Sequence, residues 1–232
     1  MQSLSNTGSR SGVEKWDISV CEFAEQNLYT AVVSDSLDQL GVRGQAMREY
    51  LRPVHGNCKV AGFARTICCS DVYHLPAQPY NVEIEAVDSL LPGEVVVVGT
   101  QKSVRNAPWG ELLSTAAKVR GARGAVVDGL IRDVRKIEEL GFPVFAAGIK
   151  PVDSMGRGLV TSYNDPVECG EVIVNAGDFI FADYDGVIVV PSAMLKQVMA
   201  LAFDKVQREN SSRAELMQGA YLRDVFQKYG VL

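Results

Sequence analysis

The 232-residue sequence has little of what zinc-binding, secreted and membrane proteins require. It contains 2 histidines and 5 cysteines but no CxxC pair, which argues against a zinc site built from Cys and His. The odd number of cysteines and their irregular spacing argue against a disulfide framework and favour a cytoplasmic protein. No apolar run approaches the ~20 residues of a membrane span. The longest runs, such as 95–98 and 187–190, have the length of strands.

Positive charge is not in excess either, because 23 Lys and Arg residues stand against 28 Asp and Glu residues, for a net charge of −5. The charges are spread along the chain, so composition gives no electrostatic case for a nucleic-acid partner. Residues 1–16 are polar and lack the apolar segment of a secretory signal, and we expect a disordered N-terminal tail there. No repeat or linker interrupts the remaining chain, which favours one α/β domain.

Strand and helix patterns alternate over the first two-thirds of the chain, and a β-rich segment and two helices follow. A helical pattern covers 20–40, where Ser34-Asp35 can cap a short helix over 36–40. The strand at 94–99 is apolar on both faces, which predicts a central position in a sheet. Residues 148–166 are expected to be mostly irregular. The other expected strands lie at 59–67, 124–127, 143–147, 172–175, 179–182 and 187–190, and further helices at 80–91, 134–140, 193–209 and 211–228.

The segment from Trp109 to Asp133 organises the rest of the chain. A tight turn opens a helix that Gly121 ends, a short buried strand follows at 124–127, and 128–133 forms a polar crossing into the next helix. This unit places a helix N-terminus close to the carboxyl end of a strand, where folds often hold anionic ligands and metals. We therefore expect the active site in this segment.

The charged and polar groups of this segment suit a small 2-oxo acid chelated to a divalent metal. The planar guanidinium of Arg132 suits bidentate binding of a carboxylate, and Asp133 supplies a hard oxygen ligand for Mg²⁺ or Mn²⁺. The first helical turn, Gly110 to Leu113, has backbone N–H groups available for an anionic or carbonyl oxygen. Glu111 in that turn can hold a metal-bound water, and the metal would polarise the carbonyl and stabilise an enolate.

The same residues also have a purely structural interpretation. A Gly-x-x-Arg-Asp sequence after a strand fits a turn with a surface ion pair, and Glu111 suits the dipole at a helix start. His74 fits a loop, and Asp183 and Asp185 fit turn chemistry. Spacing alone therefore leaves the function open.

An ordered set of five segments covers roughly residues 28–209 without a large gap, and the set is more specific than any single member. The segments are Ser34–Gly41, Val60–Thr66, Gly110-Glu111-Leu112-Leu113, Asp128–Asp133 and Gly177–Pro191. The set resembles the family of regulator-of-ribonuclease-activity-A-like (RraA-like) proteins. That family includes the class II 4-hydroxy-4-methyl-2-oxoglutarate/4-carboxy-4-hydroxy-2-oxoadipate aldolases, and its members have often been labelled demethylmenaquinone methyltransferases.

The resemblance implies a three-layer β/β/α swivelling domain, which we expect over residues 17–210. It also implies a homo-oligomer, either a homotrimer or a homohexamer made of two trimers, with active sites between subunits. Residues 211–232 lie beyond the part that matches well, and we expect a C-terminal helical extension there.

The resemblance further implies the roles of the site residues. The backbone amides of Gly110 to Leu113 would bind the pyruvate moiety, and Arg132 would bind its carboxylate and keto oxygen. Asp133 would ligate Mg²⁺, and Glu111 would reach the metal through water. Glu209, from the C-terminal helix of a neighbouring subunit, would complete the site. The implied reaction is retro-aldol cleavage of a 4-hydroxy-2-oxo acid to pyruvate through an enolate, with oxaloacetate decarboxylation as a side activity.

Two other functions stay open. A non-catalytic regulator would bind a ribonuclease or another protein and would need no metal. Glu111 beside an intact Arg132-Asp133 favours the enzyme, because the aldolase arrangement uses all three. Alternatively, a lyase or decarboxylase would act on a different 2-oxo or sugar acid, whose distal end would be read from 148–164 or a neighbouring subunit. A methyltransferase is disfavoured, because no Gly-x-Gly-x-Gly loop follows an early strand.

Overall fold

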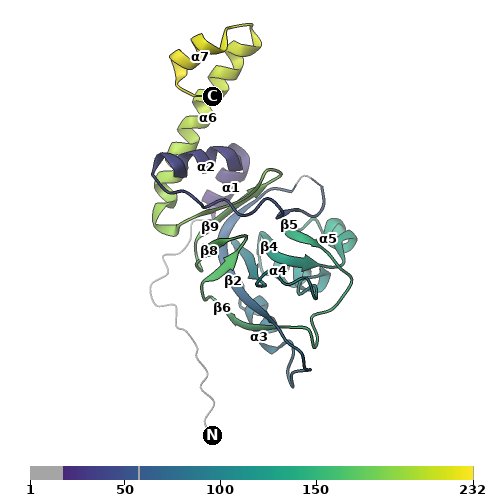
Figure 1. Ribbon diagram of the computed structural model, residues 1–232. Coiled ribbons are helices and arrows are strands. Elements are labelled where there is room, and N and C mark those ends of the chain that lie inside the picture. The colour runs from purple at the N-terminus through teal and green to yellow at the C-terminus, as the bar shows by residue number, and fades with distance from the viewer. Residues whose placement is uncertain (1–17, 57, 232) are drawn as a thin grey trace.

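One curved sheet of eight strands forms the body of the protein, in a computed structural model that describes residues 18–56 and 58–231 (Figure 1). Its strands are β1 Arg52–Pro53, β2 Val60–Asp71, β3 Glu94–Gly99, β4 Gly124–Ile131, β5 Val144–Ile149, β6 Gly158–Tyr163, β9 Phe179–Asp183 and β10 Gly186–Val190. The main path runs β1-β5-β4-β3-β2-β9-β10, and β6 pairs with β2. The guanidinium of Arg52 in β1 donates to the carbonyl oxygen of Asp185 beside β10, so the sheet is nearly closed into a barrel. The expected N-terminal tail, 1–16, lies outside the described residues.

The centre of the sheet is parallel. β2, β3, β4 and β5 run in one direction, and β9 and β10 continue the sheet as antiparallel strands beyond β2. β3 lies between β2 and β4 and is buried along its whole length, which confirms that 94–99 is a central strand. The carboxyl ends of the four parallel strands therefore meet at one edge of the sheet, where α/β folds usually bind ligands.

Apolar side chains pack on both faces of this sheet. Phe63 of β2 faces the outer helices, whereas its neighbour Ala64 faces the inside of the barrel. A hairpin of β7 (Val167–Cys169) and β8 (Val172–Val174) packs its apolar side chains into that inside core. Hairpin, sheet and helices form three layers, and the predicted β/β/α arrangement is confirmed.

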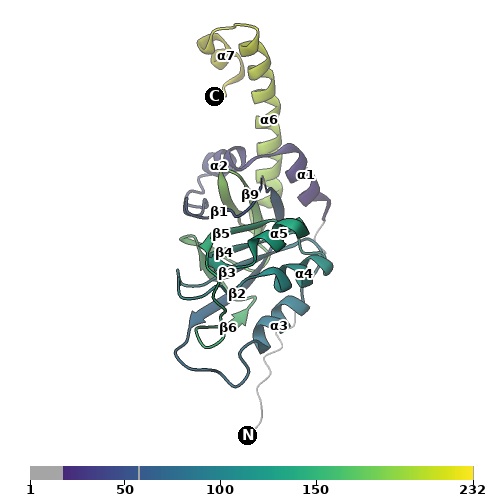
Figure 2. The same ribbon diagram turned by 90° about the vertical axis from the view of Figure 1, so that its right-hand side faces the viewer.

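Two groups of helices cover the outer face of the sheet (Figure 2). The helices are α1 Ser19–Asn27, α2 Thr30–Gln39, α3 Asn81–Asp88, α4 Glu111–Val119, α5 Val134–Leu140, α6 Leu195–Met217 and α7 Leu222–Tyr229. α3, α4 and α5 pack over the parallel strands around Trp109 and Phe142, and α1, α2 and the start of α6 pack over β9 and β10. The rest of α6 projects from the body and leads to α7 (Figure 1). No helix in the described ranges combines the length and hydropathy needed to cross a bilayer.

The first helical segment differs from its prediction. Residues 18–40 form two helices, α1 and α2, separated by two extended residues. Thr30 begins α2, and its N–H and hydroxyl donate to the carboxylate of Asp183 at 2.9 and 2.6 Å. Ser34-Asp35 lies inside α2, so the predicted cap of a short helix is wrong. A carboxylate distant in sequence supplies the hydrogen bonds at the true helix start.

The strand that leads to the predicted site is longer than expected. β4 continues through 128–131, which the sequence interpretation assigns to a polar crossing. Asp128 can lie buried in this strand because its carboxylate accepts hydrogen bonds from the Tyr50 hydroxyl at 2.9 Å and the Gly170 N–H at 3.0 Å. Only Arg132 and Asp133 remain between β4 and α5.

Two longer segments show features that the prediction lacks. Residues 148–166 are mostly irregular, as predicted, but they also contain β6, which pairs with the second half of β2. The helices predicted at 193–209 and 211–228 have wrong boundaries, since α6 continues to Met217 and α7 is a short separate helix. The expected start of a C-terminal extension, at 211, therefore lies inside α6.

A buried ion pair joins β2 to β3. Arg65 Nη2 lies 2.9 Å from Glu94 Oε2, and each side chain is only 3% exposed. We expect Glu94→Ala to lower the free energy of unfolding by about 3 kcal/mol, because it leaves the guanidinium buried without its counter-ion. Urea unfolding measures the loss. Glu139→Ala, which removes one partner of an exposed pair with Lys136, is the matched control and should cost below about 1 kcal/mol. Equal losses in the two variants would contradict the expectation.

Candidate active site

A cavity of about 340 Å³ opens at the carboxyl ends of β4 and β5. Its lining comes from 80–84 around the start of α3, from 107–113 at the start of α4, from the 132–133 turn after β4 and from 153–154 after β5. The structure brings six of the predicted site residues together here: Gly110, Glu111, Leu112, Leu113, Arg132 and Asp133.

The turn after β4 is held directly against the start of α4. The Arg132 N–H donates to the carbonyl oxygen of Trp109 at 3.0 Å, and the Glu111 N–H donates to Asp133 Oδ2 at 3.3 Å. Asp133 has a φ of 61°, in the left-handed region that aspartate tolerates better than most residues. Its carboxylate is thereby directed at the first turn of α4.

Gly110 allows this close approach. A Cβ at this position would lie 2.8 Å from Asp133 Oδ2 and 3.1 Å from Arg132 Cγ. If the cavity binds pyruvate, as the resemblance implies, we expect Gly110→Ala to weaken that affinity about tenfold, because the Arg132 and Asp133 side chains must both move. Isothermal titration calorimetry measures the change, and an unaltered affinity would show that the close approach is unimportant for binding.

Arg132 presents its guanidinium to the cavity. Its Nη2 lies 3.0 Å from Asp153 Oδ1, and its Nε lies 3.7 Å from Asp133 Oδ2. Within residues 18–56 and 58–231, its Nε and Nη1 make no hydrogen bond, and 38% of the side chain is exposed. The guanidinium can therefore donate from Nη1 to an incoming carboxylate while Asp153 holds Nη2.

The first turn of α4 supplies further donors. The first backbone hydrogen bond of this turn runs from the Ser114 N–H to the Gly110 carbonyl at 3.1 Å. The N–H groups of Leu112 and Leu113 precede it and make no hydrogen bond to the described part of the chain. Such donors at a helix N-terminus favour an anionic oxygen. The Ser114 hydroxyl fixes the turn from behind, since it accepts from Trp109 Nε1 at 2.9 Å and donates to the Gly110 carbonyl at 3.0 Å.

Three ionisable residues of the cavity are absent from the predicted site: Tyr80, Glu83 and Asp153. The Tyr80 hydroxyl donates to Asp153 Oδ2 at 2.5 Å. Burial, and then this contact with Asp153, raise the pKa of Tyr80 to about 12. Burial opposes ionisation of Asp153, but the Tyr80 hydroxyl, the Met155 N–H and the Arg132 charge together lower its pKa. One feature of the sequence could have identified Asp153 as a site residue, namely that it follows the end of a strand, as Asp133 does.

Glu83 carries the most perturbed carboxyl group of the cavity. Burial raises its pKa from 4.5 to about 7, with a further increase from the charge of Asp153 and a decrease from Arg132. The Glu83 carboxyl group therefore keeps its proton to a higher pH in the folded protein than in the unfolded chain.

The raised pKa of Glu83 predicts a pH-dependent stability. As the pH rises from 4.5 to about 7, the wild type should lose stability relative to Glu83→Gln, because only the unfolded wild-type chain releases its proton freely in this range. Urea unfolding at several pH values measures the difference, and Glu85→Gln on the same helix is the matched control. A difference between wild type and Glu83→Gln that stays constant over this range would contradict the prediction.

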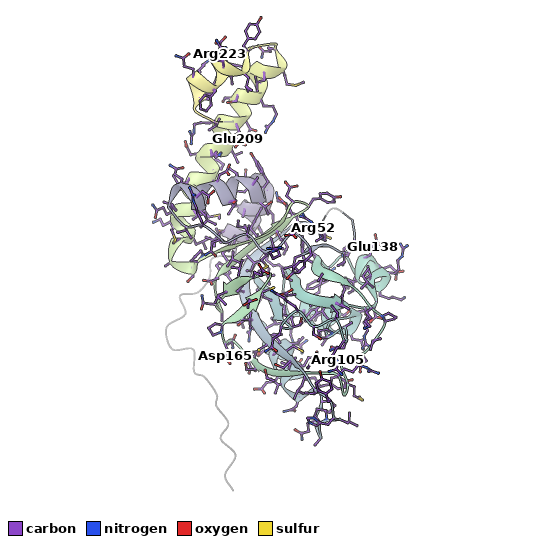
Figure 3. All side chains as sticks on the ribbon, viewed as in Figure 1. Arg52, Arg105, Glu138, Asp165, Glu209 and Arg223 are labelled. Carbon is purple, nitrogen blue, oxygen red and sulfur yellow. The ribbon has the colours of Figure 1, made fainter. Side chains whose placement is uncertain are left out.

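Glu209 does not lie with the other predicted site residues of its own chain. It is on α6, where it lines a separate cavity between α2, α6 and α7. Its Oε1 lies 4.0 Å from Lys205 Nζ, and burial raises its pKa although Arg213 lowers it. Figure 3 shows Glu209 on the projecting helix, far from Arg105, which shortly precedes the cavity-lining segment 107–113.

The donor set of the main cavity fits a divalent cation that prefers oxygen ligands. Asp133 is 47% exposed and faces the cavity, and the Glu111 carboxylate, which accepts from the Thr115 hydroxyl at 2.9 Å, lies on the adjoining helical turn. No group of three or more His, Cys, Asp or Glu side chains in the described ranges is placed to hold a metal. A cation here would use one or two carboxylates and keep several waters, which is the habit of Mg²⁺.

Comparison with known proteins gives consistent matches. The family model described as RraA-like, Aldolase/RraA, matches residues 30–189. A Halalkalibacterium halodurans protein named "Putative 4-hydroxy-4-methyl-2-oxoglutarate aldolase" is 32% identical over 184 residues, which cover 79% of this chain and 82% of that protein.

Two solved structures extend the comparison. RraAS2 of Streptomyces coelicolor, described as an unusual member of the RNase ES inhibitor RraA protein family, is 30% identical, with a TM-score of 0.76 over 87% of this chain and 98% of that one. An uncharacterized protein from Pseudomonas syringae pv. tomato is 23% identical, with a TM-score of 0.80 over 98% of this chain and 100% of that one. The second likeness concerns the fold alone, and it extends over nearly the whole chain.

Proposed function

The chain belongs to the RraA-like, aldolase/RraA family, and from this premise we propose that it is a metal-dependent carbon–carbon lyase that cleaves a 4-hydroxy-2-oxo acid to pyruvate. One observation carries the proposal. The Arg132 guanidinium, the Asp133 carboxylate and the unpaired N–H groups at the start of α4 line the same cavity. These are the groups that a 2-oxo acid and a divalent cation require.

Arg132 and the α4 amides would bind the reacting end of the substrate. The Nε and Nη1 donors of Arg132, which make no hydrogen bond to the described residues, suit the carboxylate and keto oxygen of a 2-oxo acid. The N–H groups of Leu112 and Leu113 would hold a second oxygen of the same group. When the C3–C4 bond breaks, negative charge develops on the keto oxygen, and these fixed donors stabilise that charge.

Asp133 and Glu111 would hold Mg²⁺ or Mn²⁺. A bound divalent cation supplies Lewis-acid polarisation of the keto group. The two carboxylates would place it beside Arg132, because Asp133 is the next residue and its Oδ2 contacts the first turn of α4. Oxaloacetate decarboxylation is the expected side activity, since it forms the same pyruvate enolate.

Assembly into a homotrimer or hexamer would complete the site. Glu209 lies on the projecting part of α6, away from the cavity of its own chain. We propose that this glutamate reaches the cavity of a neighbouring subunit. Sedimentation analysis of the wild type, together with mixing of inactive Arg132→Ala and Glu209→Ala chains, tests this. Restored activity in the mixture supports a shared site, whereas an active monomer would exclude it.

The proposed lyase activity is tested by measuring pyruvate release. The substrates are oxaloacetate and a 4-hydroxy-2-oxo acid, each assayed with Mg²⁺ and then with excess EDTA. Because Mg²⁺ alone decarboxylates oxaloacetate slowly, an enzyme-free control with the metal is required. We expect EDTA-sensitive turnover well above that control, and an absence of turnover on either substrate by a folded protein would contradict the proposal.

A non-catalytic regulator is the second candidate. The likeness to RraAS2, described as a member of an RNase ES inhibitor family, favours it. Such a protein would keep its activity toward a partner when Arg132 or Asp133 is replaced. A folded wild-type protein that fails the pyruvate assay but binds a ribonuclease would support this second function.

A further inference from the structure

The charges around the cavity are unbalanced. Among the described residues that line it, one side chain is a cation, Arg132, and four are carboxylic acids: Glu83, Glu111, Asp133 and Asp153. In the proposed function Arg132 binds the 2-oxo carboxylate, and Glu111 and Asp133 serve the metal. Glu83 and Asp153 therefore remain to face the rest of the substrate.

Asp153 and Tyr80 form a connected wall beside Arg132. Asp153 lies between the Arg132 guanidinium at 3.0 Å and the Tyr80 hydroxyl at 2.5 Å. Its Oδ2 also accepts the Met155 N–H at 3.2 Å, so its carboxylate is fixed by three neighbours. Tyr80 comes from the start of α3, and Glu83 lies one turn further along the same helix and lines the same cavity.

This wall suits hydroxyl groups and opposes a second anion. Carboxylates accept hydrogen bonds from hydroxyls, and the Tyr80 oxygen can accept one as well. A distal carboxylate on the substrate would lie in a partly buried space beside Asp153 and Glu83, without a second cation among the described residues that line the cavity. Like charges placed together in this way are a common means of rejecting a ligand.

We propose that Tyr80, Glu83 and Asp153 are specificity-determining residues that select 2-oxo acids with an uncharged, hydroxylated distal end and reject those with a distal carboxylate. The inference rests on the proposed lyase function and names its substrate class. The preferred substrate is then a hydroxylated 2-oxo acid of the sugar-acid kind, and the second cleavage product is a hydroxyaldehyde instead of a 2-oxo acid.

A matched pair of substrates tests the inference. 4,5-Dihydroxy-2-oxopentanoate and 4-hydroxy-2-oxoglutarate differ only in a terminal hydroxymethyl group or carboxylate. In both, the 4-hydroxyl loses its proton, the C3–C4 electron pair passes to the pyruvate enolate, and C3 takes up a proton. The products are pyruvate with glycolaldehyde in the first case and pyruvate with glyoxylate in the second. Pyruvate release therefore reports both reactions in the same assay.

The wild-type protein with Mg²⁺ should show a kcat/KM at least about tenfold higher for the hydroxymethyl substrate. At a pH of about 8.5, above the raised pKa of Glu83, Glu83→Gln should reduce this preference about threefold or more, mainly by improving the reaction of the carboxylate substrate, because it removes one opposing charge. Glu85→Gln, on the same helix but outside the cavity lining, should keep the wild-type preference. A wild-type preference for the carboxylate substrate, equal rates for the two, or an unchanged preference in Glu83→Gln would overturn the inference.

A second assay separates failure of the proposed lyase function from failure of the proposed substrate class. Pyruvate has no distal end, so exchange of its methyl protons with D₂O reports enolate formation independently of the wall. Oxaloacetate is unsuitable here, because its second carboxylate is the group that leaves. If pyruvate exchanges its protons but neither substrate is cleaved, only the proposed substrate class is overturned. The same holds if pyruvate exchanges and the carboxylate substrate is cleaved faster. An absence of both exchange and cleavage overturns the lyase function and the inference together.

Discussion

Arg132→Ala is expected to lower kcat/KM for pyruvate release by about 10³-fold, the order of loss seen when a fixed donor to a developing oxyanion is removed. This guanidinium is the cavity's only cationic group among the described residues, so no neighbour replaces it. The side chain is 38% exposed and is not part of the apolar core, so the fold should persist. Steady-state kinetics and circular dichroism of the purified variant measure the two effects.

Arg135→Ala is the matched control for Arg132→Ala. Arg135 lies in the first turn of α5, only three residues away, is 92% exposed and pairs with Glu138 on the surface. Its loss should leave kcat/KM within about twofold of the wild type. If Arg132→Ala behaved in the same way as Arg135→Ala, the ion pair with Asp153 would be a surface feature and the site assignment would be wrong.

Asp133→Asn is expected to remove the metal dependence together with the activity, again by about 10³-fold. Asparagine is preferable to alanine here because Asp133 has a φ of 61°, a conformation that asparagine also tolerates. The variant therefore loses the anionic oxygen without strain at the start of α5. Activity is compared with Mg²⁺ and with EDTA, and Mg²⁺ binding is measured directly by calorimetry.

The control for Asp133→Asn replaces a carboxylate that lies outside the proposed metal site. Glu138→Gln, on the exposed side of α5, should keep both the activity and its sensitivity to EDTA. A Mg²⁺-stimulated rate that survives in Asp133→Asn would place the metal ligand elsewhere in the protein.

Local signals predict part of the fold residue for residue. The helix at 134–140 and the strand at 94–99 have the predicted bounds. Gly141, with a φ of 66°, ends the helix, and the Pro92-Gly93 turn precedes the strand. Residues 158–163 carry no comparable signal. They form a strand because β2 extends far enough to pair with them, which depends on long-range contacts that spacing does not reveal.

The site residues also fall into two groups, those that the local sequence predicts and those that only long-range packing brings to the cavity. Glu111, Arg132 and Asp133 are predictable together because one helix–strand unit joins them within a short stretch of sequence. Glu83 and Asp153 come from α3 and from the segment after β5, and only the packing of those elements brings them to the cavity. Glu209 illustrates the limit of a single chain, since its proposed role depends on a neighbouring subunit.

Exchange of the methyl protons of pyruvate with D₂O, followed by NMR, tests the central claim most directly. It requires only the binding end of the site and forms the enolate without cleavage of a carbon–carbon bond. We predict exchange by the wild-type protein with Mg²⁺ that stops with EDTA and falls about 10³-fold in Arg132→Ala. Exchange no faster than with Mg²⁺ alone, in a folded protein, would contradict the claim that this cavity stabilises a pyruvate enolate.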